Sequence, residues 1–383
     1  MSAPERQARG GRGPRKVLYA IDALVRGGTE LQLTGLVDRL DRDRYRPHLL
    51  TIRPSPAELT PADCPHLAWH VPRLVAPGGL KALGDLARLL RRERFDVVQT
   101  FFQDSTAFAG TAARLAGVPV RVASFRDLGF WRTRAQMLLL GRVYPLMTGF
   151  LCNAGAVRDA FVASDGLDPA RFTVIPNGID TAALPFVDHD GPTRHVGLVG
   201  NLTRHVKRAD LFVRAAALVA REHPDVTWHL IGDGHLRPEL EELARAEGLG
   251  DRVVFAGRVA DVAARLGSLQ VGVICSDSEG FSNAVLEYMF RGCAVVATDV
   301  GGNSEAIDDG RTGLLVPPDD VSALAAALAR LVTDVPLRRS LAAAARAEAT
   351  ARYDWARCVA AHQDYYDHAL AAAGAASRRE VTP

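Results

Sequence analysis

The chain has 383 residues, of which 48% are hydrophobic and 23% charged, so it has room for two globular domains of ordinary size. Its formal net charge of +2 disfavours a nucleic acid as partner, and no stretch is apolar enough to predict a membrane-spanning helix. Five widely spaced cysteines without a C-x-x-C pair favour free thiols in a reducing compartment, and we therefore expect a cytoplasmic protein.

In the first half of the chain, short apolar runs alternate with longer helical patterns. Residues 1–14 are basic and Gly-rich, lack the apolar stretch of a signal peptide and are predicted to be disordered. The predicted strands are KVLYAI, HLLTI, LAWHV, DVVQTF, VRVASF and FLCN, and the predicted helices cover 29–40, 80–92, 105–116, 132–146 and 156–164.

Two segments of this half have further signals. Residues 130–150 mix Arg with Trp, Tyr, Leu and Met, as helices at a membrane surface do, although an amphipathic helix packed on its own domain explains the pattern too. The half closes with FTVIPNGID, in which Pro176-Asn177-Gly178 is a strong turn signal.

The second half repeats the alternation. Its predicted strands are HVGLVG, VTWHLIG, RVVFAG, QVGVIC, AVVAT and GLLVP. Strands that are apolar throughout indicate parallel sheets covered on both faces. We therefore predict an α/β fold with two doubly wound, Rossmann-like domains, at 15–185 and 193–350, joined by a polar, unpatterned linker. Residues 321–370 are predicted to be helical, and the last dozen residues to be frayed.

A glycine pair follows the first strand, in Arg26-Gly27-Gly28-Thr29-Glu30. Paired glycines allow the backbone to approach a ligand closely, and Thr29 can cap the helix that follows. The pattern is not G-x-G-x-x-G, and no acidic residue ends the second strand, so a nicotinamide dinucleotide is disfavoured. A plain tight turn is the alternative.

Two more loops follow strands of the second half. In the loop after HVGLVG, Arg204 and Lys207 can neutralise a diphosphate at the carboxyl edge of the sheet, with a solvated basic loop as the alternative. Gly232-Asp233-Gly234 ends the strand VTWHLI at the same edge, where a base or ribose could lie.

The most informative stretch is SDSEGFSNAVLEYMFRGCAVVATDVGG, at 276–302. It places Glu279 and Glu287 around the start of a helix, with Ser282 or Asn283 as N-cap and residues 284–291 as the helix. A strand, a turn with free N–H groups and a helix form a phosphate-binding arrangement. Since two acids would repel phosphate, we expect them to accept hydrogen bonds from hydroxyls of a sugar or ribose attached to it.

Together these motifs resemble the retaining family 4 glycosyltransferases with the GT-B fold, also described as glycosyl transferases group 1. The matching motifs, GGTE, IPNGID, VGNL with its following KR, IGDG, VVFAGRV, SEGFSNAVLE, VVATDVGGNSEAI and GRTGLLVPPDD, span residues 16–320 in the family's order. The resemblance implies two Rossmann-like domains that face each other across a cleft. It also implies a C-terminal helix, at 351–371, that crosses back to pack on the N-terminal, acceptor-side domain.

The resemblance also implies roles for single residues. Glu279 would contact the donor sugar and Glu287 the ribose, while Arg204 and Lys207 would offset charge on the leaving diphosphate. Catalytic residues would thus be Glu279, Arg204 and Lys207. The donor-binding residues would be Gly28, Gly200, Asn201, Gly232, Asp233, Gly234, Gly280, Phe281, Ser282, Asn283 and Glu287. The family needs no bound metal or cofactor and no dedicated base, because the leaving phosphate is thought to take the acceptor's proton.

The sequence departs from the family pattern at two places. Asn201 stands where the family often has Arg. Many members have a His after the DVV strand, whereas this chain has QTFFQD, in which Gln103 or Asp104 could touch a sugar. Arg126 and Asp127, after the next strand, could bind the acceptor, and a structural Arg–Asp pair is the alternative.

These motifs predict a retaining, metal-independent glycosyltransferase. It would move a sugar from a UDP- or GDP-linked donor to a saccharide or lipid-linked hydroxyl in polysaccharide or glycoconjugate biosynthesis. Peripheral contact with the inner membrane face stays an open option. The alternatives are a non-catalytic sugar-nucleotide-binding partner subunit, an epimerase of the same fold, or a phosphorylase. The phosphorylase alternative is weak, because a phosphorylase needs a lysine for pyridoxal phosphate in its second domain and this chain has only Lys207 there.

Overall fold

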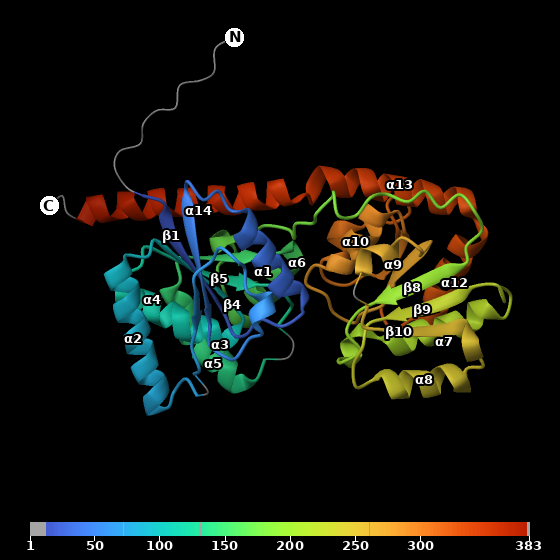
Figure 1. The fold of residues 1–383 in the computed structure, drawn as a ribbon, viewed down its shortest axis with the longest axis horizontal. Helices are drawn as coiled ribbons and strands as arrows, with labels where there is room; N and C mark the ends of the chain where they lie inside the picture. Colours follow the sequence, from blue (N-terminus) through green and yellow to red (C-terminus); the bar gives the residue numbers. More distant parts are fainter. Residues whose placement is uncertain (1–12, 72, 130–131, 260, 381–383) are drawn as a thin grey trace, which may run out of the picture. The chain divides into compact units, whose positions relative to one another are not determined.

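The computed structural model describes residues 13–71, 73–129, 132–259 and 261–380 (Figure 1). These residues form two compact units. One holds the described residues up to Ser124 together with Arg134–Gly149 and those from Gln363 onward, and the other holds those of Phe125–Thr133 and Phe150–His362. The predicted disorder of residues 1–14 falls almost wholly outside the described part of the chain.

The first sheet has seven strands in the order β3-β2-β1-β4-β5-β6-β7. The pairs β1–β2, β2–β3, β1–β4, β4–β5 and β6–β7 are parallel, and the order reverses between β1 and β4, as in a doubly wound fold. The first six strands form at the predicted apolar runs, with β3 shorter than its run, whereas β7 was not predicted as a strand. The bounds are β1 Arg15–Ile21, β2 Tyr45–Thr51, β3 His66–Ala68, β4 Val97–Phe101, β5 Val120–Phe125, β6 Gly149–Cys152 and β7 Phe172–Val174.

Helices follow these strands as the pattern predicted, with two differences. The helix predicted at 105–116 is a composite whose middle is a π-helical turn, η2, and it begins after Phe102, which has a φ of 66°. The first helix begins at Gly28, so its N-cap is Gly27 and the predicted capping role of Thr29 is wrong. The bounds are α1 Gly28–Arg39, α2 Pro77–Glu93, α3 Gln103–Ser105, η2 Thr106–Gly110, α4 Thr111–Ala116, α5 Arg134–Val143 and α6 Gly155–Asp165.

The second sheet has six strands in the order β10-β9-β8-β11-β12-β13, and neighbouring strands in it pair in parallel as well. Helices such as α7 and α8 cover it, and their apolar residues form one core with the strands, built around Phe212 and Trp228 (Figure 1). The predicted α/β fold with two parallel, Rossmann-like sheets is thereby confirmed. The strands are β8 His195–Val199, β9 Thr227–Ile231, β10 Val253–Gly257, β11 Val271–Ile274, β12 Ala294–Thr298 and β13 Leu314–Val316, and the helices α7 Ala209–Ala220, α8 Arg237–Ala246, α9 Val262–Leu266, α10 Asn283–Arg291 and α11 Asn303–Ala306.

The C-terminal part is helical, as predicted, but it is divided into α12 (Val321–Thr333), α13 (Val335–Arg352) and α14 (Trp355–Glu380). Asp334 makes the first break, because its side chain accepts a hydrogen bond from Leu337 N at 2.9 Å and so caps α13. The predicted fraying of the tail is wrong as far as Glu380, since α14 continues that far. No helix among the described residues has the length and hydropathy needed to cross a bilayer.

Candidate functional site

The candidate site of the second unit is built on an ion pair between Lys207 and Glu279. Lys207 ends a short turn after β8, and Glu279 lies in the loop after β11, the strand beside β8. The Lys207 Nζ lies 2.6 Å from Glu279 Oε1, and Ser276 Oγ donates to the same oxygen at 2.7 Å. The Glu279 side chain is 10% exposed, so a sheltered carboxylate holds a more exposed cation at the carboxyl edge of the sheet.

Close backbone contacts hold the turn that follows Glu279. A Cβ on Gly301, whose φ is +52°, would lie 1.8 Å from the Glu279 carbonyl oxygen. A Cβ on Gly302 would lie 2.2 Å from the carbonyl oxygen of Gly280, which accepts a hydrogen bond from Gly302 N at 2.8 Å. The glycine pair after β12 is thus required because the Glu279 turn lies directly against it.

The turn leads into α10, whose N-terminus has no side-chain cap. The helix begins at Asn283, one residue earlier than predicted, and Ser282 occupies the N-cap position without a hydrogen bond from its side chain to the helix. The first N–H groups of a helix carry partial positive charge and favour an anion. Phe281, just before the cap, is buried and packs its ring against Tyr353.

Glu287 lies one turn further along α10 and is half-buried. It makes no hydrogen bond or ion pair with any described residue, and burial raises the pKa of its carboxyl to about 7. A carboxylate without a partner in a sheltered place is suited to accepting hydrogen bonds from a ligand's hydroxyl groups.

Tyr288, the next residue, anchors α10 to the sheet. Its hydroxyl accepts a hydrogen bond from Val199 N at 2.8 Å and donates to Gly197 O at 3.2 Å. Gly272 on β11 leaves the space that the Tyr288 ring fills. Sequence analysis missed this residue, because a buried tyrosine in an apolar helix looks like ordinary core.

The loops after β8 and β9 support each other through backbone contacts. A Cβ on Gly232 would lie 1.9 Å from Gly200 O, and one on Gly234 would lie 2.1 Å from Leu202 O. Asp233 is exposed and bonds to the backbone of Gly234, while Asn201 is exposed beside it. The glycines predicted to touch the donor therefore serve at least to pack two loops together.

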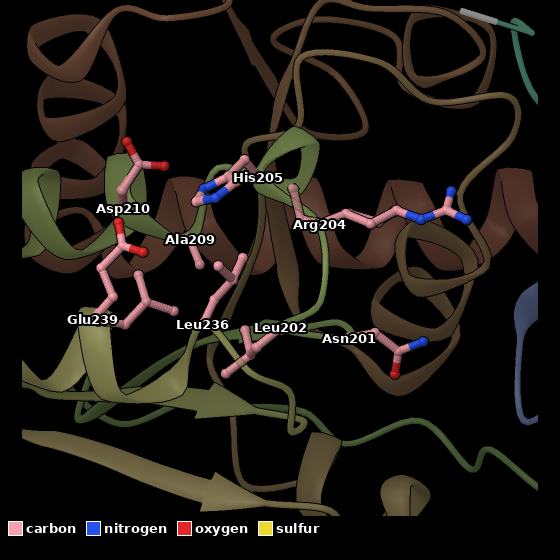
Figure 2. Close-up of a pocket in the computed structure, with 10 residues that line it drawn as sticks. Asn201, Leu202, Arg204, His205, Ala209, Asp210, Leu236 and Glu239 are labelled. Carbon is pink, nitrogen blue, oxygen red and sulfur yellow. The ribbon is translucent and has the colours of Figure 1, made fainter. Parts of the chain in front are cut away.

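Arg204 does not join the ion pair. Its side chain is exposed and has no hydrogen bond or ion pair with any described residue. Figure 2 shows its side chain extending away from a small pocket, whose other side holds His205, Asp210 and Glu239. The pocket is lined by these two carboxylates and also by Arg204, His205 and Lys207, so charges of both signs meet there.

Arg208 is a structural residue that sequence analysis missed. Its guanidinium pairs with Asp210, Asp277 and Asp319, at 3.1, 3.0 and 2.7 Å. These three carboxylates come from α7 and from the loops after β11 and β13. Arg208 therefore ties together the segments that carry Lys207 and Glu279, which a run of basic residues in the sequence could not reveal.

Three of the predicted residues lie in the first unit. Gly28 is the first residue of α1. Asp104 makes an ion pair with Arg53, and Gln103 begins α3. Gln99, the first residue of the QTFFQD segment, is buried and donates to Ser124 Oγ at 2.8 Å, so it is part of the core of this unit.

Arg126 and Asp127 lie beside the Glu279 turn of the second unit. The carbonyl oxygen of Arg126 would be 2.2 Å from a Cβ on Gly280, and the Asp127 carboxylate accepts a hydrogen bond from Gly129 N at 2.8 Å. Among the described residues, no three His, Cys, Asp or Glu side chains gather as a metal site.

Two doubly wound parallel sheets in one chain are the architecture of the GT-B glycosyltransferases, and solved structures share it. A structure of Anabaena Alr3699/HepE in complex with UDP has a TM-score of 0.82 at 21% identity, over 92% of this chain and 100% of that one. Sucrose-phosphate synthase from Thermosynechococcus elongatus has a TM-score of 0.77 at 19% identity, over 94% and 100%.

Sequence comparison identifies the family. Residues 26–183 match the model of Glycosyltransferase Family 4, and residues 193–334 match that of Glycosyl transferases group 1. A putative glycosyltransferase, EpsF of Bacillus subtilis, is 25% identical over 77% of this chain and 82% of its own length. The Escherichia coli UDP-Gal:alpha-D-GlcNAc-diphosphoundecaprenol alpha-1,3-galactosyltransferase is 26% identical over 67% and 71%. The chain belongs to the family 4 glycosyltransferases.

Proposed function

We propose that this protein is a retaining glycosyltransferase that needs no metal ion and uses a UDP- or GDP-linked sugar. The acceptor is a hydroxyl group of a saccharide or of a lipid-linked saccharide, in polysaccharide or glycoconjugate biosynthesis. The observation that carries the proposal is the Lys207–Glu279 ion pair beside the uncapped start of α10. A cation, a carboxylate and the N–H groups at the start of a helix together suit a sugar diphosphate.

The proposed roles follow from the chemistry of each group. The N–H groups from Phe281 to Asn283 and the Lys207 ammonium hold the diphosphate, Glu279 accepts hydrogen bonds from the sugar, and Glu287 accepts them from the ribose. The bond from the anomeric carbon to the phosphate oxygen breaks while the acceptor oxygen bonds to that carbon on the same face. The acceptor's proton passes to the departing phosphate, whose charge Lys207 stabilises.

Names of relatives support a nucleotide-sugar donor. The Escherichia coli relative is named for UDP-Gal and an alpha-D-GlcNAc-diphosphoundecaprenol acceptor, and the Anabaena protein has been solved with UDP. Peripheral membrane contact is part of the proposal, because Leu138 and Leu139 of α5 are 67% and 37% exposed between Arg134 and Arg142. Sedimentation with anionic vesicles, which Leu138→Glu should weaken, tests that part.

A thermal-shift panel of UDP, GDP, ADP and their sugars tests the donor assignment. A ligand at a hundred times its dissociation constant adds about 2.7 kcal/mol of stability, so the correct nucleotide should raise the unfolding temperature clearly. If none of them does, the proposal is wrong.

Turnover distinguishes an enzyme from a binding subunit. Hydrolysis or transfer of the donor sugar should be lost in Glu279→Ala and kept in Glu239→Ala, a carboxylate of the small pocket that serves as the matched control. Tight nucleotide binding without turnover with any acceptor would favour the partner-subunit alternative.

A further inference from the structure

The turn Pro176-Asn177-Gly178 is in contact with the start of α10. Asn177 is 4% exposed, and its amide nitrogen donates to Phe281 O at 3.1 Å and to Asn283 Oδ1 at 2.7 Å. A carboxamide nitrogen carries two hydrogens, and Asn177 uses both on the two sides of Ser282. The two bonds therefore bracket the N-cap of α10.

These bonds also determine how Asn283 is oriented. Phe281 O can only accept, so the nitrogen of Asn177 must face it and must also be the donor to Asn283 Oδ1. Asn283 accordingly turns its oxygen toward Asn177 and its NH2 group to the opposite end. The Asn283 Oδ1 atom, which would repel an anion, is thus held toward Asn177 by the hydrogen bond that it accepts.

Asn177 is itself held in place by the start of α14. Ile179 N donates to Tyr353 O at 2.9 Å, and Trp355 N donates to Ile179 O at 3.2 Å. Gly178 lies so close to the Trp355 ring that a Cβ would be 2.5 Å from it. Tyr353 in turn packs its ring on Phe281, with centroids 5.2 Å apart. Phe281 is therefore fixed through its carbonyl by Asn177 and through its ring by Tyr353.

We infer that Asn177 is a positioning residue for the nucleoside diphosphate of the donor. It orients the Phe281–Ser282–Asn283 backbone so that the N–H groups of this segment are directed at the diphosphate, and it does not touch the ligand. This inference rests on the proposed function, because it assumes that the diphosphate binds at the start of α10.

Asn177→Asp tests the inference, because it keeps the shape of the side chain and removes both donors. An ionised carboxylate would face Phe281 O and Asn283 Oδ1, both acceptors, so we expect the turn to shift and the dissociation constant for UDP or GDP to rise at least about tenfold. Titration calorimetry of the full chain measures this dissociation constant. A protonated carboxyl recovers one donor, so the ratio of variant to wild-type dissociation constants should shrink as the pH falls from 8 toward 5.

Asn303→Asp is the matched control. Asn303 is also fully buried and donates to a backbone carbonyl, Thr298 O at 3.0 Å, but makes no bond to the Phe281–Asn283 turn. We expect it to lower the unfolding temperature without a tenfold loss of nucleotide affinity. If Asn177→Asp proves unstable, Asn177→Ala replaces it, and hydrogen exchange of the amides of 281–285 should be faster than in the wild type.

Several results would overturn the inference. They are a folded Asn177 variant that binds UDP or GDP within about twofold of the wild type, a ratio that does not change with pH, and an equal loss in Asn303→Asp. Wild-type protein that binds neither nucleotide would instead remove the proposed function, and the inference with it.

Discussion

Lys207 and Glu279 form an ion pair, although 72 residues separate them in the chain. The proposed function requires that donor binding redirects both side chains, the ammonium to phosphate and the carboxylate to sugar hydroxyls. Sequence analysis selected both residues and gave them separate roles. It could not predict their bond, because spacing along the chain does not say which loops meet at the edge of a sheet.

Lys207→Ala should lower kcat about a hundredfold and change the donor KM only a few-fold. The reason is that the lysine's charge is matched to the diphosphate that leaves in the transition state. Steady-state kinetics with the donor found in the thermal-shift panel measures both constants. Lys207→Arg keeps the charge and should retain more activity, and an unchanged kcat in Lys207→Ala would refute this role.

The substitution Arg204→Ala tests whether Arg204 contributes less to turnover than Lys207. Because Arg204 extends into solvent without a partner among the described residues, we expect a loss of kcat well below that of Lys207→Ala. A loss of equal size, measured in the same assay, would show that Arg204 moves to the diphosphate when the donor binds.

Glu287 makes stability depend on pH. Burial raises the pKa of its carboxyl from 4.5 to about 7, so the folded protein binds more protons than the unfolded chain between these values. The resulting loss of stability grows as the pH rises through that window and is complete above 7. Glu287→Gln should therefore be about 1 to 3 kcal/mol more stable than the wild type at pH 8 and nearly equal to it at pH 4.

Urea unfolding at the two pH values measures the Glu287→Gln effect. The same substitution should weaken nucleotide binding, because an amide is a poorer acceptor for ribose hydroxyls than a carboxylate. Equal stability of the two proteins at pH 8 would mean that the carboxyl is better solvated than its burial indicates.

At the scale of elements, sequence predicted what depends on local pattern. Apolar runs located the strands other than β7, and the helix predicted at 284–291 matches α10 within one residue. Contacts between distant segments were missed, among them the Arg208 network and the Tyr288 bonds to β8. The tail was mispredicted as frayed because its alanine-rich composition shows no cap, although alanine is the best helix former.

The glycine pair after β12 provides a prediction with an internal control. Gly301 and Gly310 both have left-handed backbones, with φ of +52° and +73°, but only Gly301 has a neighbour where a Cβ would go. Gly310→Ala should cost about 1 kcal/mol of strain and leave nucleotide affinity unchanged. Gly301→Ala should cost more, because Ala would displace the Glu279 carbonyl, and should also weaken UDP or GDP binding.

Calorimetry measures the nucleotide affinity of the two alanine variants, and urea unfolding measures their stability. Together they distinguish backbone strain alone from displacement of the Glu279 carbonyl. If Gly301→Ala and Gly310→Ala lose the same stability and both bind nucleotide normally, the close contact of Gly301 with Glu279 has no functional role.

At the scale of the whole molecule, the chain's two sheets were predictable from apolar runs, whereas single contacts between distant segments were not. The helix α14 supplies its first residues to one unit and those from Gln363 onward to the other. In the first unit Tyr366 lies fully buried, with its hydroxyl 3.1 Å from that of Tyr19 and donating to Gln99 Oε1. Such a contact joins residues 267 positions apart, which no local pattern encodes.

Tyr366→Phe should destabilise the protein by about 1 to 3 kcal/mol, since it leaves the buried Gln99 oxygen without this donor. Urea unfolding measures the change, and nucleotide affinity should stay as in the wild type because the residue lies in the first unit. A variant as stable as the wild type would mean that the hydroxyl is replaced by another donor.

The place of Tyr366 has a consequence for how the protein is made. Tyr366 is synthesised long after β1, yet it belongs to the unit that contains this strand. In the nascent chain, the surface of the first unit that Tyr366 covers at Tyr19 and Tyr45 therefore stays open until α14 has left the ribosome. Chaperone demand during synthesis should accordingly fall only after α14 has emerged.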